Sequence, residues 1–324
     1  MSSRLSRWLT PWRHRARDHQ ARATAALAAA RVDRIRAILE HVPPPAPRGV
    51  ARRGTPRLPQ PLYFASSVCT AEDFRHPEFH RWIAALAERT RYHRKLWEFV
   101  FIAAHLEAAG LLAAPARGLG FGVGREKLPA AFAARGCRIV ATDQALDAAV
   151  AAGWAQSNQH ARGLDVLNLD GLCPDQAFRE RVGFATCDMN RIDPGLRDFD
   201  FCWSSCSLEH LGSIAAGAAF VRASLETLKP GGIAVHTTEY NLSSNERTVD
   251  DNPGTVIFRR RDIEALVAAL AADGHHVMDV SFECVTGPVD LFVDEPPYTA
   301  DVHLRLELLG HVSTSIGLVI EKAR

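Results

Sequence analysis

Gly118-Leu119-Gly120-Phe121-Gly122-Val123-Gly124 is the stretch of the chain that decides its fold. It follows a short apolar segment and precedes a helical pattern that starts near Arg125. Glycines at this spacing let the backbone turn sharply after a strand and approach a ligand where a Cβ atom would collide. The N-terminus of the next helix adds free N–H groups and partial positive charge. The run therefore predicts a strand, a ligand-binding turn and a helix, although glycines also occur in simple turns.

A second expected strand ends in an acidic side chain. Arg138-Ile139-Val140-Ala141-Thr142-Asp143 is a short apolar segment that ends 19 residues after Gly124. An acid at the carboxyl end of the second strand can accept both ribose hydroxyls of an adenosine-containing cofactor. An aspartate at this place could also cap a helix. The glycine run before it favours ribose binding by Asp143.

Short apolar runs alternate with helical patterns beyond Pro115. Strands are expected near 116–119, 138–142, 184–187, 199–204 and 232–238. Helices are expected near 125–135, 146–156, 213–228 and 261–273. This alternation predicts an α/β fold with a doubly wound, mostly parallel, Rossmann-like sheet. Two later strand-like segments, 277–282 and 315–320, have no long helix between them and are expected to close the sheet edge in antiparallel orientation.

Composition divides the chain into three parts. Residues 1–60 hold 13 Arg, no Lys and three acids, a local charge of 13 − 3 = +10, although the whole chain carries only +1. We expect residues 1–61 to form a basic Arg/Pro-rich tail and linker, with helical spacing from Ala21 to Val42. Residues 62–115 are expected to be a helical cover, and 116–324 the catalytic domain. A basic tail suits contact with an anionic membrane surface or a protein, or it is a solvated extension; an Arg-rich organelle presequence is a third alternative.

The composition excludes several classes of protein. A chain of 324 residues with 47% apolar residues is neither fibrous nor wholly disordered. The small net charge gives no global reason to expect nucleic acid as a partner. The seven cysteines are odd in number and lack CxxC spacing, which favours free thiols in a reducing compartment. With no apolar run of about 18–20 residues and no signal-peptide pattern, a cytoplasmic protein is expected.

The glycine run does not match the commonest nucleotide-binding motifs. The nicotinamide fingerprint GxGxxG fails in every frame, because Val123, Arg125 and Lys127 stand where glycine is needed. A GxxxxGK[ST] loop is also absent from the sequence.

Three further motifs follow in order. They are Cys187-Asp188-Met189, the run from Phe199 to His210 (FDFCWSSCSLEH), and Leu228-Lys229-Pro230-Gly231-Gly232. With the glycine run and Asp143, these motifs make the chain from about Ala116 to Lys322 resemble the class I S-adenosylmethionine-dependent methyltransferases. In that family the glycine loop wraps the methionine end of the cofactor, and the acid and hydrophobic residue after the third strand flank the adenine.

The resemblance implies S-adenosyl-L-methionine as the cofactor. The implied cofactor-binding residues are Gly118, Gly120, Phe121, Gly122, Gly124, Asp143, Gln144, Asp188, Met189 and Ser204. The sequence departs from the family at Gly118, where an acid usually helps to orient the amino group of the cofactor. Glu126, just after the loop, is a candidate substitute.

Candidate catalytic residues lie where the fourth and fifth strands end. His210 follows the fourth strand, and an imidazole suits a general base at neutral pH if a hydroxyl must lose its proton. Glu209 and His236 complete the catalytic prediction, although His210 could be a surface histidine and His236 a core one. A divalent metal held by Glu209, His236 and Glu239 is conceivable, but no spacing requires it, so no metal is predicted.

Candidate substrate contacts come from two segments. Glu239 and Tyr240 follow the fifth strand, and His93 and Lys95 belong to an aromatic and basic segment in the helical cover. Asp294-Glu295-Pro296-Pro297-Tyr298 resembles the [DN]PP[YFW] motif of nucleic-acid base methyltransferases, but it lies near the C-terminus rather than after the fourth strand. We interpret it as a Pro-rich turn near the substrate entrance, and nucleic acid is not expected as a partner.

The sequence thus predicts an S-adenosylmethionine-dependent methyltransferase that acts on oxygen, with a small molecule or a glycan hydroxyl as acceptor. Two alternatives stay open at this stage. One is a nicotinamide-dependent oxidoreductase built on a similar sheet. The other is a non-catalytic protein that binds the cofactor, or binds partners through its tail.

Overall fold

The computed structural model describes residues 22, 24–38, 40, 66–145, 160–298 and 302–324. The helix expected at 146–156 lies outside these residues.

Five parallel strands form the body of the central sheet. They are β5 (Val182–Thr186), β4 (Arg138–Asp143), β3 (Arg117–Phe121), β6 (Phe199–Ser205) and β8 (Leu228–Asn241), in this spatial order. Along the chain this order is third, second, first, fourth, fifth, which is the doubly wound arrangement. The direction of winding reverses between β3 and β6, and ligands bind outside the carboxyl ends of the strands at such a switch point. The expected parallel strands are confirmed.

The other edge of the sheet is antiparallel, as expected. β15 (His311–Glu321) runs antiparallel to β8 over nine residue pairs. Its other neighbours are β1 (Ser66–Val68), β10 (His276–Val277) and β14 (Arg305–Leu308). β11 (Val280–Ser281), in the segment expected at 277–282, pairs with β1 in parallel rather than antiparallel orientation, and β12 (Val293–Asp294) also pairs with β14 in parallel. β1 was not expected from the sequence, and it makes a short strand of the cover segment part of the central sheet.

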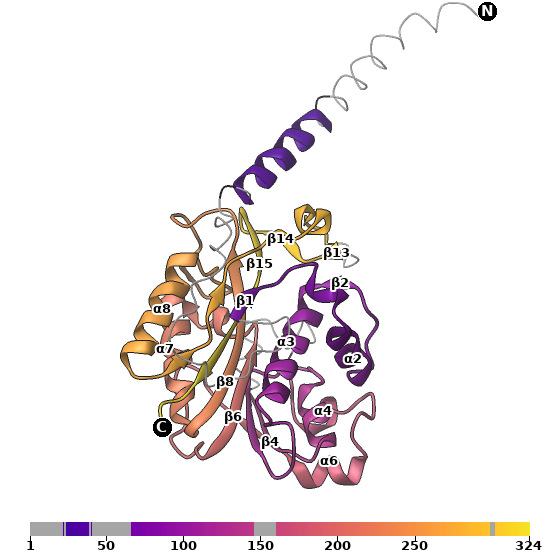
Figure 1. The fold of residues 1–324 in the computed structure, drawn as a ribbon, viewed down its shortest axis with the longest axis vertical. Helices are drawn as coiled ribbons and strands as arrows, with labels where there is room; N and C mark the ends of the chain where they lie inside the picture. The colour runs from indigo at the N-terminus through magenta and orange to yellow at the C-terminus, as the bar shows by residue number, and fades with distance from the viewer. Residues whose placement is uncertain (1–21, 23, 39, 41–65, 146–159, 299–301) are drawn as a thin grey trace, which may run out of the picture.

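Helices cover both faces of the sheet (Figure 1). On one side lie α2 (Pro77–Ala85), α3 (Arg94–Ala108), α4 (Leu128–Ala134) and α6 (Asp175–Arg181). On the other side lie α7 (Ile214–Glu226) and α8 (Arg260–Ala272). Each face has its own apolar core, one with Trp97, Phe132 and Trp203, the other with Phe121 and Phe220. Because both faces are covered, β8 reads as a nearly continuous buried run rather than an alternating one.

Local signals explain where the helices begin. Pro77 occupies the first turn of α2, where its missing N–H costs nothing. His93 caps α3 by accepting a hydrogen bond from the backbone of Lys95, and Ser213 caps α7 in the same way. The helical cover expected over residues 62–115 therefore contains two helices, α2 and α3, which β2 (Tyr92–His93) separates. β2 pairs with β13 (Val302–His303), which links the cover segment to the C-terminal region.

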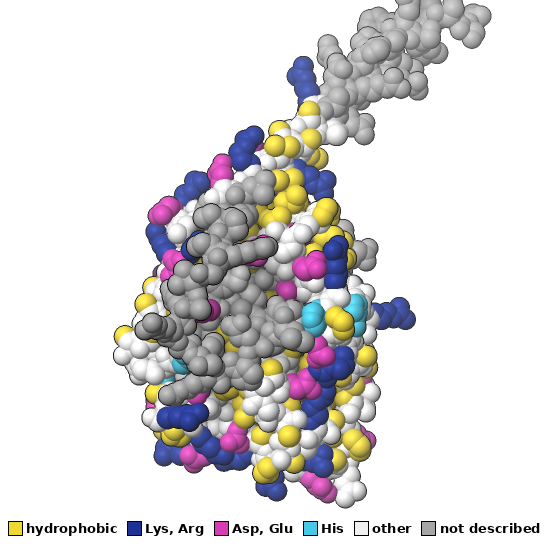
Figure 2. All heavy atoms as spheres, viewed as in Figure 1, with side chains coloured by type: hydrophobic (Ala, Val, Ile, Leu, Met, Phe, Trp, Pro, Cys, Tyr) yellow, Lys and Arg dark blue, Asp and Glu magenta, His cyan; other side chains and the backbone are white. Residues whose placement is uncertain are grey.

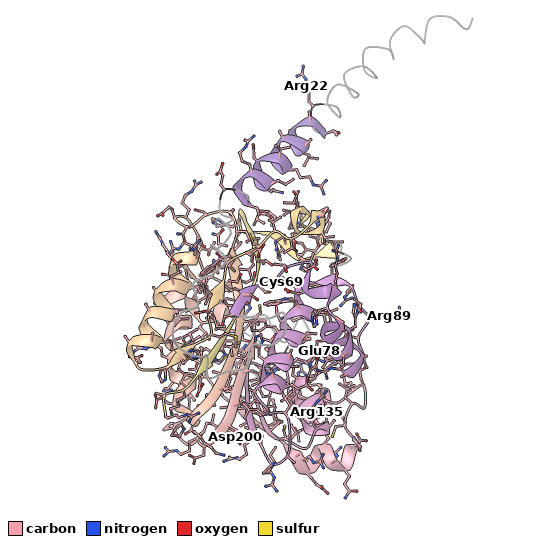
Figure 3. The ribbon with its side chains drawn as sticks, viewed as in Figure 1. Arg22, Cys69, Glu78, Arg89, Arg135 and Asp200 are labelled. Carbon is pink, nitrogen blue, oxygen red and sulfur yellow. The ribbon has the colours of Figure 1, made fainter. Side chains whose placement is uncertain are left out.

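Short elements complete the structure. The 3₁₀ turns are η1 (Asp73–Arg75), η2 (Leu164–Val166), η3 (Leu208–His210) and η4 (Pro288–Leu291). β7 (Gly212–Ser213) pairs with β9 (Asp251–Asn252). Asp200, near the start of β6, lies at the lower end of the sheet in Figure 3, so the carboxyl ends of the parallel strands lie toward the opposite end.

Residues 24–38 of the basic tail are helical and extend away from the sheet in Figure 1. Arg22 marks the far end of this segment in Figure 3. At the near end, the Arg31 guanidinium lies 5.4 Å from the centre of the Phe292 ring, and Arg34 forms an ion pair with Glu295. Ile38 is fully buried. Among the described residues, no helix is long and apolar enough to cross a membrane.

Acidic and basic side chains are interspersed on the surface that Figure 2 shows. On that face, the described residues form no continuous patch of one charge.

Candidate functional site

The turn after β3 lies at the switch point and needs glycine at two positions. Gly122 and Gly124 have φ angles of +57° and +52°, which L side chains rarely adopt. A Cβ atom on Gly122 would also lie 2.9 Å from the Ser207 hydroxyl and 3.2 Å from the Met189 sulfur. The turn is thus packed against the loops after β6 and β5, and Met189 belongs to the second of these loops.

The first two glycines of the run are required for a different reason, which is the packing of β3 against β6. Gly118 and Gly120 lie inside β3, where a Cβ atom would collide with the rings of Phe201 and Trp203 on β6. Their role in this sheet is to make room for those rings. Phe121 is buried, with its ring 5.2 Å from Phe220 in an edge-on contact. The side chain of Phe121 therefore belongs to the core, and the expected contact of this residue with the cofactor stays a prediction for its backbone.

Asp143 ends β4 and is bonded directly to the glycine turn. Its Oδ2 atom accepts hydrogen bonds from the backbone N–H groups of Gly124 (3.2 Å) and Ala161 (2.9 Å). Its Oδ1 atom accepts one from the N–H of Gln144 (2.8 Å). Burial raises the pKa of the Asp143 carboxyl above its ordinary value. The structure thus brings together the acid and the turn that the sequence paired.

Asp188 and Ser204, two further residues that were expected to bind the cofactor, differ in the direction of their side chains. Asp188 is exposed and accepts a hydrogen bond from the backbone of Asn190. Ser204 is fully buried, and its hydroxyl bonds Nδ1 of His236 at 2.8 Å. The Ser204 side chain therefore points into the protein, whereas Asp188 faces outward.

A cluster of charged side chains, with buried carboxylates and partly exposed cations, lies between α3 and the ends of β6, β8 and β15. Lys95 Nζ lies 2.6 Å from Glu98, and Arg94 forms an ion pair with Glu239. Glu98 is fully buried and also accepts hydrogen bonds from Cys206 (3.0 Å) and Ser315 (2.5 Å). Burial opposes ionisation, but the charges of Lys95 and Arg94 lower the pKa of Glu98 to about 2. Two expected substrate contacts, Lys95 and Glu239, belong to this cluster.

Glu209 and His210 lie beside the cluster on η3. Burial and the nearby charge of Glu239 raise the pKa of Glu209, whose carboxylate accepts a hydrogen bond from Thr238 at 3.2 Å. His210 Nδ1 lies 2.6 Å from the carbonyl of Gly254, to which it donates, and its Nε2 lies 4.0 Å from Glu209. Burial lowers the pKa of His210 to about 4. At neutral pH this imidazole is uncharged and can accept a proton at Nε2.

His236 does not join this group, which corrects the prediction that it is catalytic. It is a core residue, with Nδ1 bonded to Ser204 and Nε2 3.0 Å from the hydroxyl of Ser224. Burial lowers its pKa to about 3. Both nitrogens are therefore occupied within the protein.

Tyr240 is also separated from Glu239. Its ring is buried in the other core, 6.0 Å from Phe282. Successive side chains of a strand point to opposite faces of the sheet, so neighbouring positions on β8 lie on different sides. This corrects the expectation that Glu239 and Tyr240 form one substrate contact.

Donor atoms of Cys206, Glu209 and Glu239 lie within 4.8 Å of one another. However, Arg94 already pairs with Glu239, and Cys206 donates to Glu98. Two of the three groups thus already have partners within the protein, and we propose no metal here.

Sequence reasoning missed several polar residues near the site. Arg94 and Glu98 have the four-residue spacing of a helical ion pair, which was a usable signal. The hydrogen bond of 2.7 Å between His303 and Asp294 joins positions nine residues apart in a segment expected to be a turn. The ring of His303 lies 4.8 Å from that of His93, so this expected substrate residue lies near the Asp294–His303 pair.

No protein-family model matches the sequence, and a search of curated proteins finds no match. Solved structures are similar at low identity. The chain is 16% identical to 1,6-didemethyltoxoflavin-N1-methyltransferase of Burkholderia thailandensis, crystallised with 1,6-didemethyltoxoflavin and S-adenosylhomocysteine, with a TM-score of 0.42 over 79% of this chain and 92% of that one. It is 14% identical to the methyltransferase domain of bacterial CtHen1 (TM-score 0.44; 71% and 100% covered) and 14% identical to CcbJ of Streptomyces caelestis (TM-score 0.38; 71% and 94% covered).

Proposed function

We propose that this chain is a class I S-adenosylmethionine-dependent methyltransferase. The observation that supports this most is the bond between Asp143 and Gly124 at the switch point of the sheet. It joins a left-handed glycine turn to an acid at the end of the neighbouring strand, where doubly wound folds bind adenosine-containing ligands. Among adenosine-containing ligands, the ordered motifs around this bond favour S-adenosylmethionine.

The residues at the turn fit such a cofactor. Gly122 and Gly124 leave backbone without side chains at the turn, and Asp143 offers carboxylate oxygens for ribose hydroxyls. Glu126 supplies a buried carboxyl that accepts a hydrogen bond from the indole N–H of Trp203 at 2.6 Å. Burial raises the pKa of Glu126 to about 8, and a cationic amino group beside it would favour the ionised form.

Glu126 also accounts for the missing acid at position 118. A side chain there would collide with Phe201, so β3 cannot carry the acid that the family usually has. We propose that Glu126 takes its place and contacts the α-amino group of the cofactor.

The acceptor group that fits best is a hydroxyl on a small molecule or a glycan. The cofactor supplies an electrophilic methyl group, and a hydroxyl must lose its proton when oxygen attacks. The uncharged His210 has its Nδ1 fixed by Gly254, so its Nε2 can take that proton. Glu209 lies 4.0 Å from that nitrogen, and Lys95, Glu239 and His93 are proposed to contact the acceptor.

The first test is calorimetric titration of the purified chain with S-adenosylhomocysteine, with NAD as a parallel titrant. The proposal expects stoichiometric binding of S-adenosylhomocysteine alone. Methyl-labelled S-adenosylmethionine would then be incubated with a panel of methyl hexosides, phenols and catechols. Failure to bind S-adenosylhomocysteine would overturn the proposal, and binding of NAD alone would favour an oxidoreductase.

A further inference from the structure

His160 lies next to Asp143 and has a buried nitrogen that no described residue satisfies. His160 is buried, with only 8% of its surface exposed. Its Nε2 lies 2.8 Å from the backbone carbonyl of Gln144, whereas Nδ1 has no hydrogen-bond partner within the described parts of the chain. Buried polar atoms without a partner are rare in native proteins, so this nitrogen needs an explanation.

The surrounding bonds define the chemistry of that nitrogen. Because Nε2 faces a carbonyl oxygen, it must carry the hydrogen and donate it. In the neutral ring, Nδ1 then bears a lone pair and can only accept a hydrogen bond. A matching ligand must therefore offer a donor, such as a hydroxyl.

Two contacts hold His160 beside the acid of β4. The N–H of the next residue, Ala161, donates to Asp143 Oδ2 at 2.9 Å. The imidazole itself is bonded to Gln144, the residue after Asp143. These two hydrogen bonds thus hold the imidazole ring beside the end of β4.

Asp143 and His160 together present two acceptors. Asp143 Oδ2 already accepts from Gly124 and Ala161, while Oδ1 accepts from one described group, the N–H of Gln144. A carboxylate oxygen can accept two hydrogen bonds, so Oδ1 keeps room for one donor among the described contacts. One acceptor on Oδ1 and one on Nδ1 suit a ligand with two neighbouring hydroxyls.

We propose that His160 is a ribose-binding residue, whose Nδ1 accepts a hydrogen bond from one hydroxyl of the ribose diol while Asp143 accepts the other. This inference rests on the proposed function, because it takes an adenosine-containing ligand at the end of β4. It divides the recognition of the diol between a carboxylate and an imidazole, rather than giving both hydroxyls to Asp143.

The test compares S-adenosylhomocysteine with its 2′-deoxy and 3′-deoxy forms by calorimetry. The proteins are the wild type, His160→Phe, His160→Asn and a control, His105→Phe. His105 is buried to 3% exposure on α3 and bonds the carbonyl of Phe101, so the control makes the same change elsewhere in the core. Melting temperatures of all variants check that they fold.

His160→Phe should weaken binding of S-adenosylhomocysteine by about 3- to 10-fold, the effect of one neutral hydrogen bond. In the wild type, one of the two deoxy ligands should lose a similar factor through His160. That loss should vanish in His160→Phe, persist in His105→Phe and return in part in His160→Asn, whose amide oxygen can replace Nδ1.

Two negative outcomes are distinguishable. If the wild type binds S-adenosylhomocysteine and both deoxy penalties are unchanged in His160→Phe, His160 does not contact the ribose and the proposed function stands. If the wild type does not bind S-adenosylhomocysteine at all, both proposals fail. If His160→Phe does not fold, His160→Ala, which has no acceptor in its side chain, takes its place, and full affinity with unchanged deoxy penalties in that variant would overturn the inference.

Discussion

Asp143 serves the fold and the proposed site at the same time. Its carboxylate fixes the glycine turn through Gly124 and the returning chain through Ala161. A ligand that bonds this carboxylate therefore meets a group whose position is already fixed, and it loses little entropy in ordering it.

Replacing Asp143 with alanine should abolish detectable binding of S-adenosylhomocysteine. The change removes the ribose acceptor and frees the N–H groups of the turn. Calorimetry measures the result, with Asp279→Ala as the matched control, because Asp279 is an exposed aspartate in the segment between β10 and β11. Full affinity in Asp143→Ala would contradict the placement of the ribose at β4.

Glu126 should release a proton when the cofactor binds. Burial raises its pKa to about 8, so most of the carboxyl is protonated at pH 7 in the free protein. A cationic amino group favours the carboxylate, which lowers the pKa and expels the proton. Calorimetry of S-adenosylhomocysteine in two buffers with different ionisation enthalpies measures this release.

Glu126→Gln tests whether the released proton comes from Glu126. The variant should bind S-adenosylhomocysteine more weakly than the wild type, and fewer protons should be released for each ligand that binds. 5′-Methylthioadenosine, which lacks the amino group, should release no proton from either protein. Equal release in wild type and Glu126→Gln would remove Glu126 from the cofactor contacts.

His210→Gln should lower kcat for the best hydroxylated acceptor about 100-fold or more while leaving affinity for S-adenosylhomocysteine unchanged. The pKa of His210 is lowered to about 4, so its imidazole stays unprotonated from pH 8 down to about pH 5, and any change of kcat within this range is assigned to Glu209, whose pKa is raised. Steady-state kinetics across pH give both readouts. An unchanged kcat in the variant would exclude His210 as the base.

At the scale of elements, α3 brings a set of charges into the protein against the strand ends. Glu98 is fully buried and stays ionised because Lys95 and Arg94 lie beside it on the same helix. Removing one member of a buried ionic group leaves the others uncompensated, which is costly.

Glu98→Ala should therefore lower the free energy of unfolding by about 3 kcal/mol or more. Glu264→Ala is the control, since Glu264 forms an exposed ion pair with Arg260 on α8, and its loss should cost about 0.5 kcal/mol or less. Urea unfolding measures both. The pKa of Glu98 is lowered from 4.5 to about 2, so its stabilisation is present above pH 4.5 and is lost as pH falls toward 2.

The parallel strands were predictable because each has an apolar run and a clear boundary. Glycines end β3, Asp143 ends β4, and Pro230 with two glycines marks the start of the apolar part of β8. It was harder to predict on which face of the sheet each side chain of β8 lies, because the local sequence does not show which of the two cores a position belongs to. His236 was therefore grouped with Glu239, although the alternation of the strand puts them on opposite sides.

The charged cluster was less predictable still. Lys95 and Glu239 were named, but as separate polar contacts. Arg94 joins Glu239 to α3 across 145 positions of the chain, a distance that no local pattern reveals. Long-range ion pairs depend on how the elements dock, and docking is a property of the whole fold.

At the scale of the whole molecule, the cover segment and the sheet are tied together at several places. β1 pairs with β15, β2 pairs with β13, and Trp97 of α3 is fully buried in the same core as Trp203 of β6. The boundary predicted at residue 115 thus separates two stretches of sequence that share one core.

A chain that begins at residue 116 should therefore not fold cooperatively. It would lack β1 and would expose the apolar surface that α2 and α3 cover. Circular dichroism during urea unfolding should show a broad transition or none, whereas the full chain unfolds in a single step. A sharp transition of comparable midpoint would mean that residues 116–324 fold independently.

The packing of Trp203 under the glycine turn has an optical consequence. Its indole lies where a Cβ atom on Gly120 would be 2.5 Å away, and its N–H is bonded to Glu126. Indole emission responds to a charge placed near the ring nitrogen, so ionisation of Glu126 changes the colour of Trp203 fluorescence. The molecule thus contains its own reporter of occupancy, one that could follow ligand arrival in a stopped-flow instrument without any label.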